Sequence, residues 1–381
     1  MKDDVKAPEQ AHLRRALELA EGGRGRVSPN PLVGAVIVRD DEVIGEGFHA
    51  ELGGLHAERA ALADCRARGE EPAGATMYVT LEPCAHQGRQ PPCVEAILEA
   101  GVARVVIASE DPSEKAAGRG PAILRDGGVE FAFASEAEAT AARRLNQPFR
   151  KHARTGLPLV VLKMAMSLDG QTTTGPDDSP WISGPQSRDL VHTWRAESDA
   201  IAVGIGTALA DDSLLTARID GARQPKRVVF DSQARLPLDS QLLRTLDQAP
   251  VFVVAAPDAP GDRISALQGA GAEIIVASDL DSALRDLGRR EVTSLFLEGG
   301  QTLASSFLSG DLIDESRTFI APMLLGRQPN PVPRAGGDDR EDSPGRESPR
   351  SETGPARLTA LESSTAQVGE DTLITARYKE W

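Results

Sequence analysis

Short apolar runs recur along the first 150 residues, and helix-like segments separate them. The strand-like runs are residues 33–38, 76–81, 104–108 and 129–133, and the helical patterns cover 57–67 and 94–100. Strands that alternate with helices favour a buried sheet whose two faces are both covered by helices. The sequence therefore predicts an α/β fold for this part of the chain.

A second alternating series follows residue 158, so the chain holds more than one such unit. Its length of 381 residues also exceeds what a single hydrophobic core usually supports. We predict two α/β domains, 1–149 and 159–381, joined by a basic, aperiodic linker at 150–158. The expected strands of the second domain are 159–164, 200–203, 227–230, 251–255, 273–277, 294–297, 317–321 and, as an edge or terminal strand, 371–378.

Residues 330–355 differ in composition from everything around them. They contain five prolines and only two residues of the apolar set, Val332 and Ala335. Such a segment cannot bury enough apolar surface to offset its ordering entropy. We predict a disordered insert without chemistry.

A histidine, a glutamate and two cysteines in the first half form the strongest functional motif. His56 and Glu58 are two residues apart, and Cys84 and Cys93 follow. Catalytic zinc takes three protein ligands and leaves a fourth position for water, whose pKa the metal lowers. The H-x-E spacing is typical of zinc deaminases, in which the glutamate carries protons and is not a ligand. We expect His56, Cys84 and Cys93 to bind Zn²⁺ and Glu58 to be the catalytic residue.

Other interpretations of these residues remain open from the pattern alone. The usual deaminase spacing is C-x-x-C, whereas eight residues separate Cys84 from Cys93. A structural zinc site normally has four ligands, for which His86 is the nearest further candidate, and buried thiols without metal are the remaining alternative. Cys65, in the middle of a helical pattern, fits a core thiol. His12, His152 and His192 are expected at the surface.

Two glycine clusters in the second half, 203–207 and 297–302, each follow a predicted strand. Backbone amides at a glycine turn and helix start form a natural anion site. Neither cluster is a complete G-x-G-x-x-G, so a tight strand-to-helix turn and a cofactor site are equally compatible with each.

Composition and charge limit the compartment and the partners. Three cysteines, two of them assigned to metal, leave no disulfide framework, and no apolar stretch reaches 18 residues. We therefore expect a cytoplasmic protein without a membrane segment. A net charge of −15 argues against nucleic acid, whereas local arginines can still bind a small phosphorylated metabolite. The sequence does not fix the oligomeric state and is compatible with a homo-oligomer.

Many separated motifs, in one order, together resemble the bifunctional riboflavin biosynthesis deaminase/reductase. In the first half these are SPNPLVG at 28–34, GFH at 47–49, HAE at 56–58, TLEPCAHQGRQPPC at 80–93 and AGRG at 117–120. In the second half they are KMAMSLDG at 163–170, WISG at 181–184, VGIGTALADDSLLT at 203–216 and EGGQTLA at 298–304. The wide cysteine spacing agrees with this family.

The resemblance implies a cytidine-deaminase-like three-layer α/β/α domain followed by a dihydrofolate-reductase-like α/β domain. The first domain would hydrolyse the 2-amino group of 2,5-diamino-6-(ribosylamino)pyrimidin-4-one 5'-phosphate. The second would use NADPH to reduce the ribosyl side chain to ribityl. The partner is thus a phosphorylated pyrimidine.

The resemblance also implies further site residues. In the deaminase, the substrate would meet Asn30, His49 and His86. In the reductase, NADPH would meet Ala165, Trp181, Thr207, Asp211, Gly300, Gln301, Thr302, Leu303, Ala304, Ser305 and Ser306. The reductase substrate would meet Ser179, Arg195, Leu215, Arg218 and Glu298. The two arginines suit the phosphate of this substrate.

Three places depart from the family pattern. Ser113 and Glu114 stand where Asn-Pro is common, Gln90 where Thr is usual, and Ser213 where Pro is common. None of these changes removes a zinc ligand or Glu58.

Overall fold

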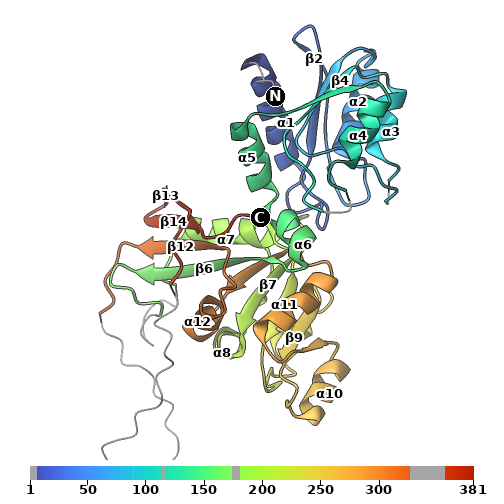
Figure 1. Cartoon of the computed structure of the whole chain (residues 1–381). Coiled ribbons are helices and arrows are strands. Elements are labelled where there is room, and N and C mark those ends of the chain that lie inside the picture. Colours follow the sequence, from blue (N-terminus) through green and yellow to red (C-terminus); the bar gives the residue numbers. More distant parts are fainter. Residues whose placement is uncertain (1–6, 89, 114–115, 174–180, 327–356) are drawn as a thin grey trace, which may run out of the picture.

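Two β-sheets, one on each side of residue 150, organise the chain (Figure 1). The computed structural model describes residues 7–88, 90–113, 116–173, 181–326 and 357–381. The predicted insert at 330–355 lies outside these residues. Within the described part, no helix is both long and apolar enough to cross a membrane.

The first sheet has five strands in the order β2-β1-β3-β4-β5. Strand β1 pairs antiparallel with β2 and β3, and β3, β4 and β5 run parallel. The strands are β1 (Gly34–Arg39), β2 (Glu42–Phe48), β3 (Thr76–Val79), β4 (Arg104–Ile107) and β5 (Glu130–Phe133).

Helices cover both faces of this sheet. Successive residues of a strand point to opposite faces, so each strand can contribute side chains to two cores. Ala35 and Ile37 of β1 join a core with α2 (Ala57–Ala67), α3 (Cys93–Glu99) and α4 (Arg119–Asp126). Val36 and Val38 join a second core with α1 (Ala7–Glu21) and α5 (Glu136–Leu145). This arrangement confirms the expected three-layer α/β/α architecture.

The second sheet has nine strands in the order β10-β9-β8-β7-β11-β6-β12-β14-β13. Its first seven strands run parallel, and the last two add antiparallel pairs. The strands are β6 (Leu159–Ser167), β7 (Ala200–Gly204), β8 (Lys226–Phe230), β9 (Val251–Ala255), β10 (Glu273–Val276), β11 (Ser294–Glu298), β12 (Glu315–Ala321), β13 (Glu362–Val368) and β14 (Asp371–Arg377).

Helices also flank this sheet. Trp194 of α7 (Pro185–Glu197) packs against Phe296 and Phe319. Phe307 of α12 (Gln301–Ser309) belongs with Leu297 to a different core cluster. The other helices are α8 (Ile205–Asp211), α9 (Gln241–Arg244), α10 (Gly261–Gly269) and α11 (Leu280–Arg289). Both glycine clusters are strand-to-helix turns, at the neighbouring strands β7 and β11.

The predicted apolar strands are confirmed, whereas two strands were not predicted. Strand β2 carries glycine and glutamate among its apolar residues, and every residue of β13 except Val368 is exposed. Residues 371–377 form the last strand in the chain, which confirms the terminal alternative of the prediction, whereas β13 occupies the edge of the sheet.

Helix α6 (Gln147–Thr155) occupies most of the segment predicted to be an irregular linker and contacts groups from both halves. The guanidinium of Arg150 donates to Ser109 Oγ and to the carboxylate of Glu110 in the first half, and to the Trp381 carbonyl in the second. The Lys151 ammonium binds the Asp314 carboxylate at 2.5 Å. The junction is therefore packed and helical, while the domain limits themselves stay a prediction.

Candidate active sites

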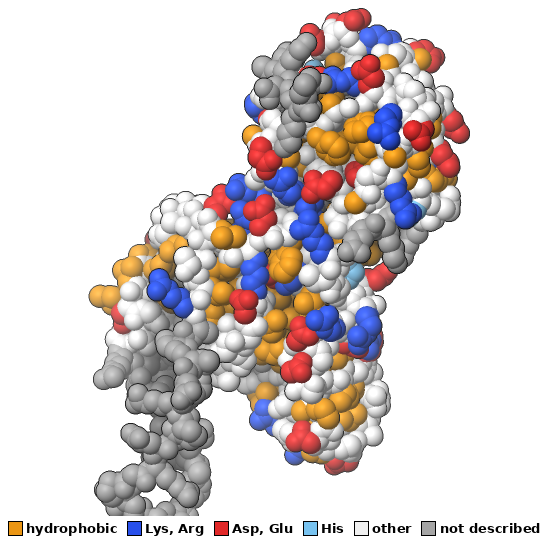
Figure 2. Space-filling view, in the orientation of Figure 1, with side chains coloured by type: hydrophobic (Ala, Val, Ile, Leu, Met, Phe, Trp, Pro, Cys, Tyr) orange, Lys and Arg blue, Asp and Glu red, His pale blue; other side chains and the backbone are white. Residues whose placement is uncertain are grey.

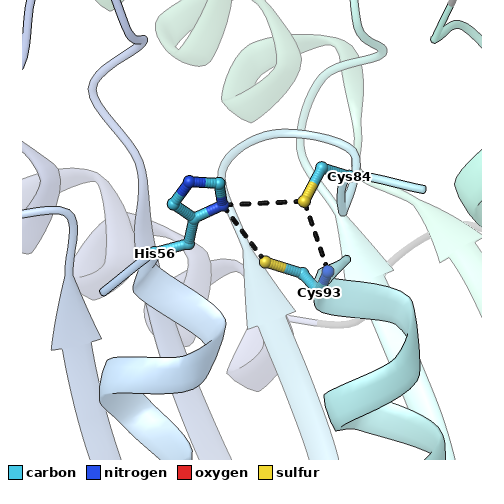
Figure 3. Close-up of side chains that lie close together, drawn as sticks. All are labelled: His56, Cys84 and Cys93. Atoms are coloured by element: carbon cyan, nitrogen blue, oxygen red, sulfur yellow. Dashed lines mark hydrogen bonds between the residues drawn. The ribbon is translucent and has the colours of Figure 1, made fainter. Parts of the chain in front are cut away.

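His56, Cys84 and Cys93 lie together with their ligand atoms directed at one another (Figure 3). His56 Nδ1 is 3.6 Å from Cys84 Sγ and 3.4 Å from Cys93 Sγ. Ligand atoms about 2.1 and 2.3 Å from one tetrahedral zinc ion lie about 3.6 Å apart, so this donor set fits zinc. Within the described residues, no other group of three His, Cys, Asp or Glu side chains brings its ligand atoms within 4.8 Å of one another.

Helix starts position two of the three ligands. His56 is the N-cap of α2, and Cys93 is the first residue of α3 after the N-cap Pro92. Arg59 of α2 donates to the Pro92 carbonyl at 2.9 Å and so ties the two helix starts together. Cys84 lies in the loop after β3, where its sulfur accepts the Cys93 backbone N–H at 3.2 Å. Positive helix ends favour the thiolates that a metal requires.

The surroundings of the two cysteines shift the pKa values of their thiols in opposite directions. The hydrogen bonds from Cys93 and His56 lower the pKa of Cys84 to about 4, against the opposing effect of burial. The same hydrogen bond to Cys84, together with burial, raises the pKa of Cys93. Zinc binds cysteine as the thiolate, so metal binding at Cys84 and Cys93 is coupled to the loss of any proton that these thiols carry.

Glu58 is only 3% exposed and lies beside the three ligands, on the first turn of α2. Burial and the negative charge of Cys84 raise its pKa to about 7. A carboxyl group with a pKa near neutrality can both accept and return a proton under cellular conditions.

Asn30 and His49 form a hydrogen-bonded pair next to the zinc ligands. Asn30 Nδ2 donates to His49 Nε2 at 3.1 Å, and His49 Nδ1 donates to the Leu55 carbonyl at 2.9 Å. The His49 ring packs edge-on against the His56 ring, with centroids 5.2 Å apart. His86 is exposed in the loop between the two cysteines, where Gln90 also donates to the Gly53 carbonyl at 2.8 Å.

Glu82 supports this site from the loop that carries Cys84, and it was not among the residues predicted from the sequence. Its buried carboxylate accepts three backbone N–H groups, from Asp111, Gly118 and Gly120, at 3.1–3.4 Å. Glu82 therefore anchors the loop before α4 beside Cys84. The one available signal was a charged residue in an otherwise apolar stretch before Pro83.

In the second half, Arg195 of α7 and Glu298 at the end of β11 form a two-point ion pair. Arg195 Nε and Nη2 donate to the two carboxylate oxygens of Glu298 at 2.6 and 2.8 Å, and Nη1 donates to the Thr216 carbonyl. Lys163, which sequence reasoning did not assign, lies opposite Glu298 on the neighbouring strand β6. Burial lowers the pKa of Lys163, and the nearby Glu298 carboxylate opposes this shift.

The loop after α8 contributes the other predicted substrate residues. Leu215 is buried and Arg218 is exposed, and both have a positive φ, of 52° and 54°. Non-glycine residues in this region are strained, and such strain is concentrated at ligand sites. Ser179, the remaining predicted substrate residue, lies outside the described residues.

Most of the predicted cofactor residues lie in α8 and at the start of α12, which follow β7 and β11. The Gly300 N–H donates to Thr207 Oγ1 at 3.1 Å, which joins the start of α12 to α8. Gln301 donates to Thr172 Oγ1 at 3.0 Å. The other members of this set are Ala165 on β6, Asp211 at the end of α8, Thr302, Leu303, Ala304, Ser305 and Ser306 on α12, and Trp181 before α7, which is 57% exposed.

Three histidines outside the zinc motif were expected at the surface, and each is instead half-buried. His12 packs on Tyr78, with ring centroids 5.1 Å apart, and His152 Nε2 lies 3.0 Å from the Gly288 carbonyl. His192 lies one turn before Arg195 on α7, and its Nδ1 is buried without a hydrogen-bond partner. Burial lowers the pKa of His192.

Charges of both signs are interspersed on the face shown in Figure 2, where the described residues form no extended basic area.

Two family descriptions match the chain. Residues 6–109 match the cytidine and deoxycytidylate deaminase zinc-binding region, and residues 158–363 match the RibD C-terminal domain. The three zinc-ligand candidates fall within the first match. Arg195 and Glu298 fall within the second.

Curated relatives match most of the chain. The riboflavin biosynthesis protein RibD of Actinobacillus pleuropneumoniae is 40% identical over 331 residues, which cover 85% of this chain and 86% of that protein. The RibD protein of Escherichia coli strain K12 is 39% identical over 348 residues, covering 84% and 89%.

Solved structures match the fold over almost its full length. RibD of Acinetobacter baumannii superimposes with a TM-score of 0.81 at 36% identity, covering 98% of this chain and 99% of that chain. A Thermotoga maritima protein described as a diaminohydroxyphosphoribosylaminopyrimidine deaminase/5-amino-6-(5-phosphoribosylamino)uracil reductase has a TM-score of 0.80 at 32% identity, with the same coverage.

Proposed function

This chain belongs to the RibD family of bifunctional riboflavin biosynthesis deaminase/reductases, and on this premise we propose which of its residues perform each reaction. The deaminase site is the cluster of His56, Glu58, Cys84 and Cys93. The reductase site is the region between Arg195, Glu298 and the start of α12. The observation that carries the deaminase assignment is the 3.4–3.6 Å spacing between His56 Nδ1 and the two sulfurs.

Glu58 moves the protons in the deaminase. Zinc, when bound by His56, Cys84 and Cys93, supplies a Lewis acid that lowers the pKa of water. With a pKa of about 7, the Glu58 carboxylate accepts a proton from the water molecule that attacks the amine-bearing ring carbon. Glu58 then returns this proton to the departing nitrogen, which leaves as ammonia. Asn30 and His49 orient the pyrimidine, since both lie next to His56.

In the reductase, the protein's part is to place the two reactants, and NADPH, when bound, supplies the hydride. Glu298 and the Thr216 carbonyl fix the Arg195 guanidinium and use three of its five N–H groups. The two remaining N–H groups and the exposed fork of Arg218 suit the substrate phosphate. Lys163 adds a buried positive charge beside Glu298.

The substrate assigned to the deaminase is 2,5-diamino-6-(ribosylamino)pyrimidin-4-one 5'-phosphate. The deaminated product is then the substrate of the reductase. We expect the enzyme to work in the cytoplasm, and a homo-oligomer stays a prediction.

Incubation of the zinc-loaded protein with the diaminopyrimidinone phosphate, with and without NADPH, tests both halves. Ammonia should be released in either case, and NADPH oxidation should follow only after deamination. Ammonia release without any NADPH oxidation would contradict the reductase assignment. The absence of ammonia from a zinc-loaded sample would contradict the deaminase assignment.

Replacement of Glu58 tests the proton carrier separately from the metal. Glu58→Gln keeps the size of the side chain but cannot accept a proton, so deamination should slow by about 100-fold or more. Zinc content, measured by atomic absorption, should remain that of the wild type. Normal ammonia release from the zinc-loaded variant would contradict the assignment, and NADPH oxidation with pre-deaminated substrate serves as the internal control.

A further inference from the structure

One hydrogen bond joins the substrate loop of the deaminase to a buried carboxylate of the reductase half. Ser28 Oγ donates to Asp199 Oδ2 at 2.7 Å, across 171 positions of the sequence. Asp199 is 2% exposed and immediately precedes β7. The two halves thus meet directly behind the Ser28–Asn30 turn.

Asp199 is well satisfied even without Ser28. The same Oδ2 also accepts the Thr293 hydroxyl at 2.7 Å and the Thr293 and Ser294 backbone N–H groups at 2.8 and 3.2 Å. Arg223 binds Oδ1 at 2.5 Å. Because four other donors hold this carboxylate, it provides a fixed anchor, and removal of the Ser28 hydroxyl leaves it neither unpaired nor exposed.

Ser28 lies two residues before Asn30, which belongs to the proposed deaminase pocket. The Asn30 N–H donates to the Val27 carbonyl at 2.9 Å, which closes the turn that carries Ser28. Asn30 Nδ2 then donates to His49 Nε2, and the His49 ring contacts His56. Four short steps therefore connect Asp199 to a zinc-ligand candidate, through Ser28, Asn30 and His49.

A second contact restrains the same segment. Gly25 packs so closely on α7 that a Cβ atom there would lie 2.8 Å from the Ala196 carbonyl oxygen, and its φ is +75°. The chain from Gly25 to Asn30 is thus held against the reductase half at two points, one of them through a side chain.

We propose that Ser28 is a positioning residue of the deaminase, through which the reductase half holds Asn30 and His49 in the orientation that binds the pyrimidine. This inference rests on the proposed function of the zinc site. It implies that contacts with the reductase half complete the deaminase pocket.

Steady-state deamination by the full-length, zinc-loaded Ser28→Ala protein tests the inference. KM for the diaminopyrimidinone phosphate should rise about fivefold, the size expected for one lost hydrogen bond of about 1 kcal/mol. kcat, zinc content and the reductase kcat/KM should stay within twofold of the wild type. Ser28→Thr keeps the hydroxyl and should restore KM.

Ser294→Ala is the matched control. It removes the Ser294 hydroxyl that accepts the Asp199 N–H at 2.9 Å, and it leaves the Ser28 hydrogen bond in place. A deaminase KM that rises equally in this variant would overturn the proposal, because the effect would then come from a loosened interface in general.

A double-mutant cycle with Asn30→Ala tests the route of the effect. If Ser28 acts through Asn30, Ser28→Ala should change KM by less than twofold in the Asn30→Ala background. Independent, multiplicative effects would overturn the proposal, as would an unchanged KM in Ser28→Ala. Wild-type protein that releases no ammonia would instead contradict the proposed function, so the two failures are distinguishable.

Discussion

His49 is held in one neutral form by its two hydrogen bonds. His49 Nδ1 donates to the Leu55 carbonyl, and His49 Nε2 accepts from Asn30. Protonation of Nε2 would therefore place its N–H opposite the Asn30 amide N–H, with no acceptor between them. Burial lowers its pKa below the ordinary 6.5. A histidine whose folded-state pKa is lowered destabilises the fold as the pH falls from 6.5 through that pKa, because the unfolded chain binds the proton more readily.

An NMR titration of the histidine rings checks this prediction. His49 should titrate below 6.5, and Asn30→Ala should raise its pKa, because the donor that opposes protonation is gone. A His49 pKa at or above 6.5 in the wild type would contradict the neutral assignment.

Arg195 tests how far the reductase depends on a planar, two-point ion pair. Arg195→Lys keeps the charge but cannot bind both Glu298 oxygens, so the reductase KM should rise about tenfold. NADPH oxidation with pre-deaminated substrate measures the effect, and ammonia release in the same protein should not change. A reductase KM equal to that of the wild type would mean that charge alone suffices.

Individual site residues could be predicted from the sequence where they belong to a motif. Residues whose role depends on packing could not be predicted in this way. The pattern of His56, Cys84 and Cys93 predicted a zinc cluster, because a zinc site dictates residue types, and the structure brings these three side chains together. Glu82 and Lys163 could not be found, since their roles depend on which backbone amides and carboxylates the fold brings near them. His192 was assigned to the surface because its buried neighbours are distant in the sequence.

At the scale of elements, the start of α4 packs directly on the zinc loop. A Cβ atom at Gly120 would lie 2.3 Å from the Pro83 carbonyl oxygen, and the Gly120 N–H donates to Glu82 at 3.2 Å. Gly120→Ala should therefore push the loop that carries Cys84 away from α4.

We expect Gly120→Ala to weaken zinc affinity about tenfold, the size typical of lost support behind a metal ligand. Competition with a chromophoric chelator measures the affinity. Gly88→Ala is the matched control, because it lies in the same loop and its Cβ would meet nothing nearer than 4.0 Å. Equal losses in both variants would contradict this role for Gly120.

Elements were predictable where burial gave them a strong apolar pattern. Residues 251–255 form a strand with all five side chains buried, and they were predicted with the correct limits. Strand β13 has the sequence ESSTAQV and is held by pairing with β14 alone, so its strand character comes from backbone hydrogen bonds that no local pattern reveals. Strand β2 was missed because two glycines interrupt its apolar residues.

At the scale of the whole molecule, a buried ion pair joins α6 to the second sheet. The Lys151 and Asp314 side chains are 3% and 0% exposed, and Asp314 also accepts the Val160 N–H and the Trp381 indole N–H. Burial lowers the pKa of Lys151, and the Asp314 carboxylate counteracts this shift.

Asp314→Ala would leave a buried ammonium without its partner. We expect it to reduce the free energy of unfolding by about 3–5 kcal/mol, measured by urea denaturation. The double variant Lys151→Met/Asp314→Leu should recover part of this loss, since it buries no charge but still leaves the Val160 and Trp381 donors without their acceptor. A single variant as stable as the wild type would contradict the importance of the pair.

The packing of α6 also bears on any attempt to separate the two halves with a protease. Arg150 and Lys151 are consecutive basic residues, the type after which trypsin cuts, yet they are only 1% and 3% exposed. Proteolytic nicking requires an accessible backbone that can adapt to the enzyme's cleft. Under native conditions trypsin should thus spare this junction and cut first at exposed loops.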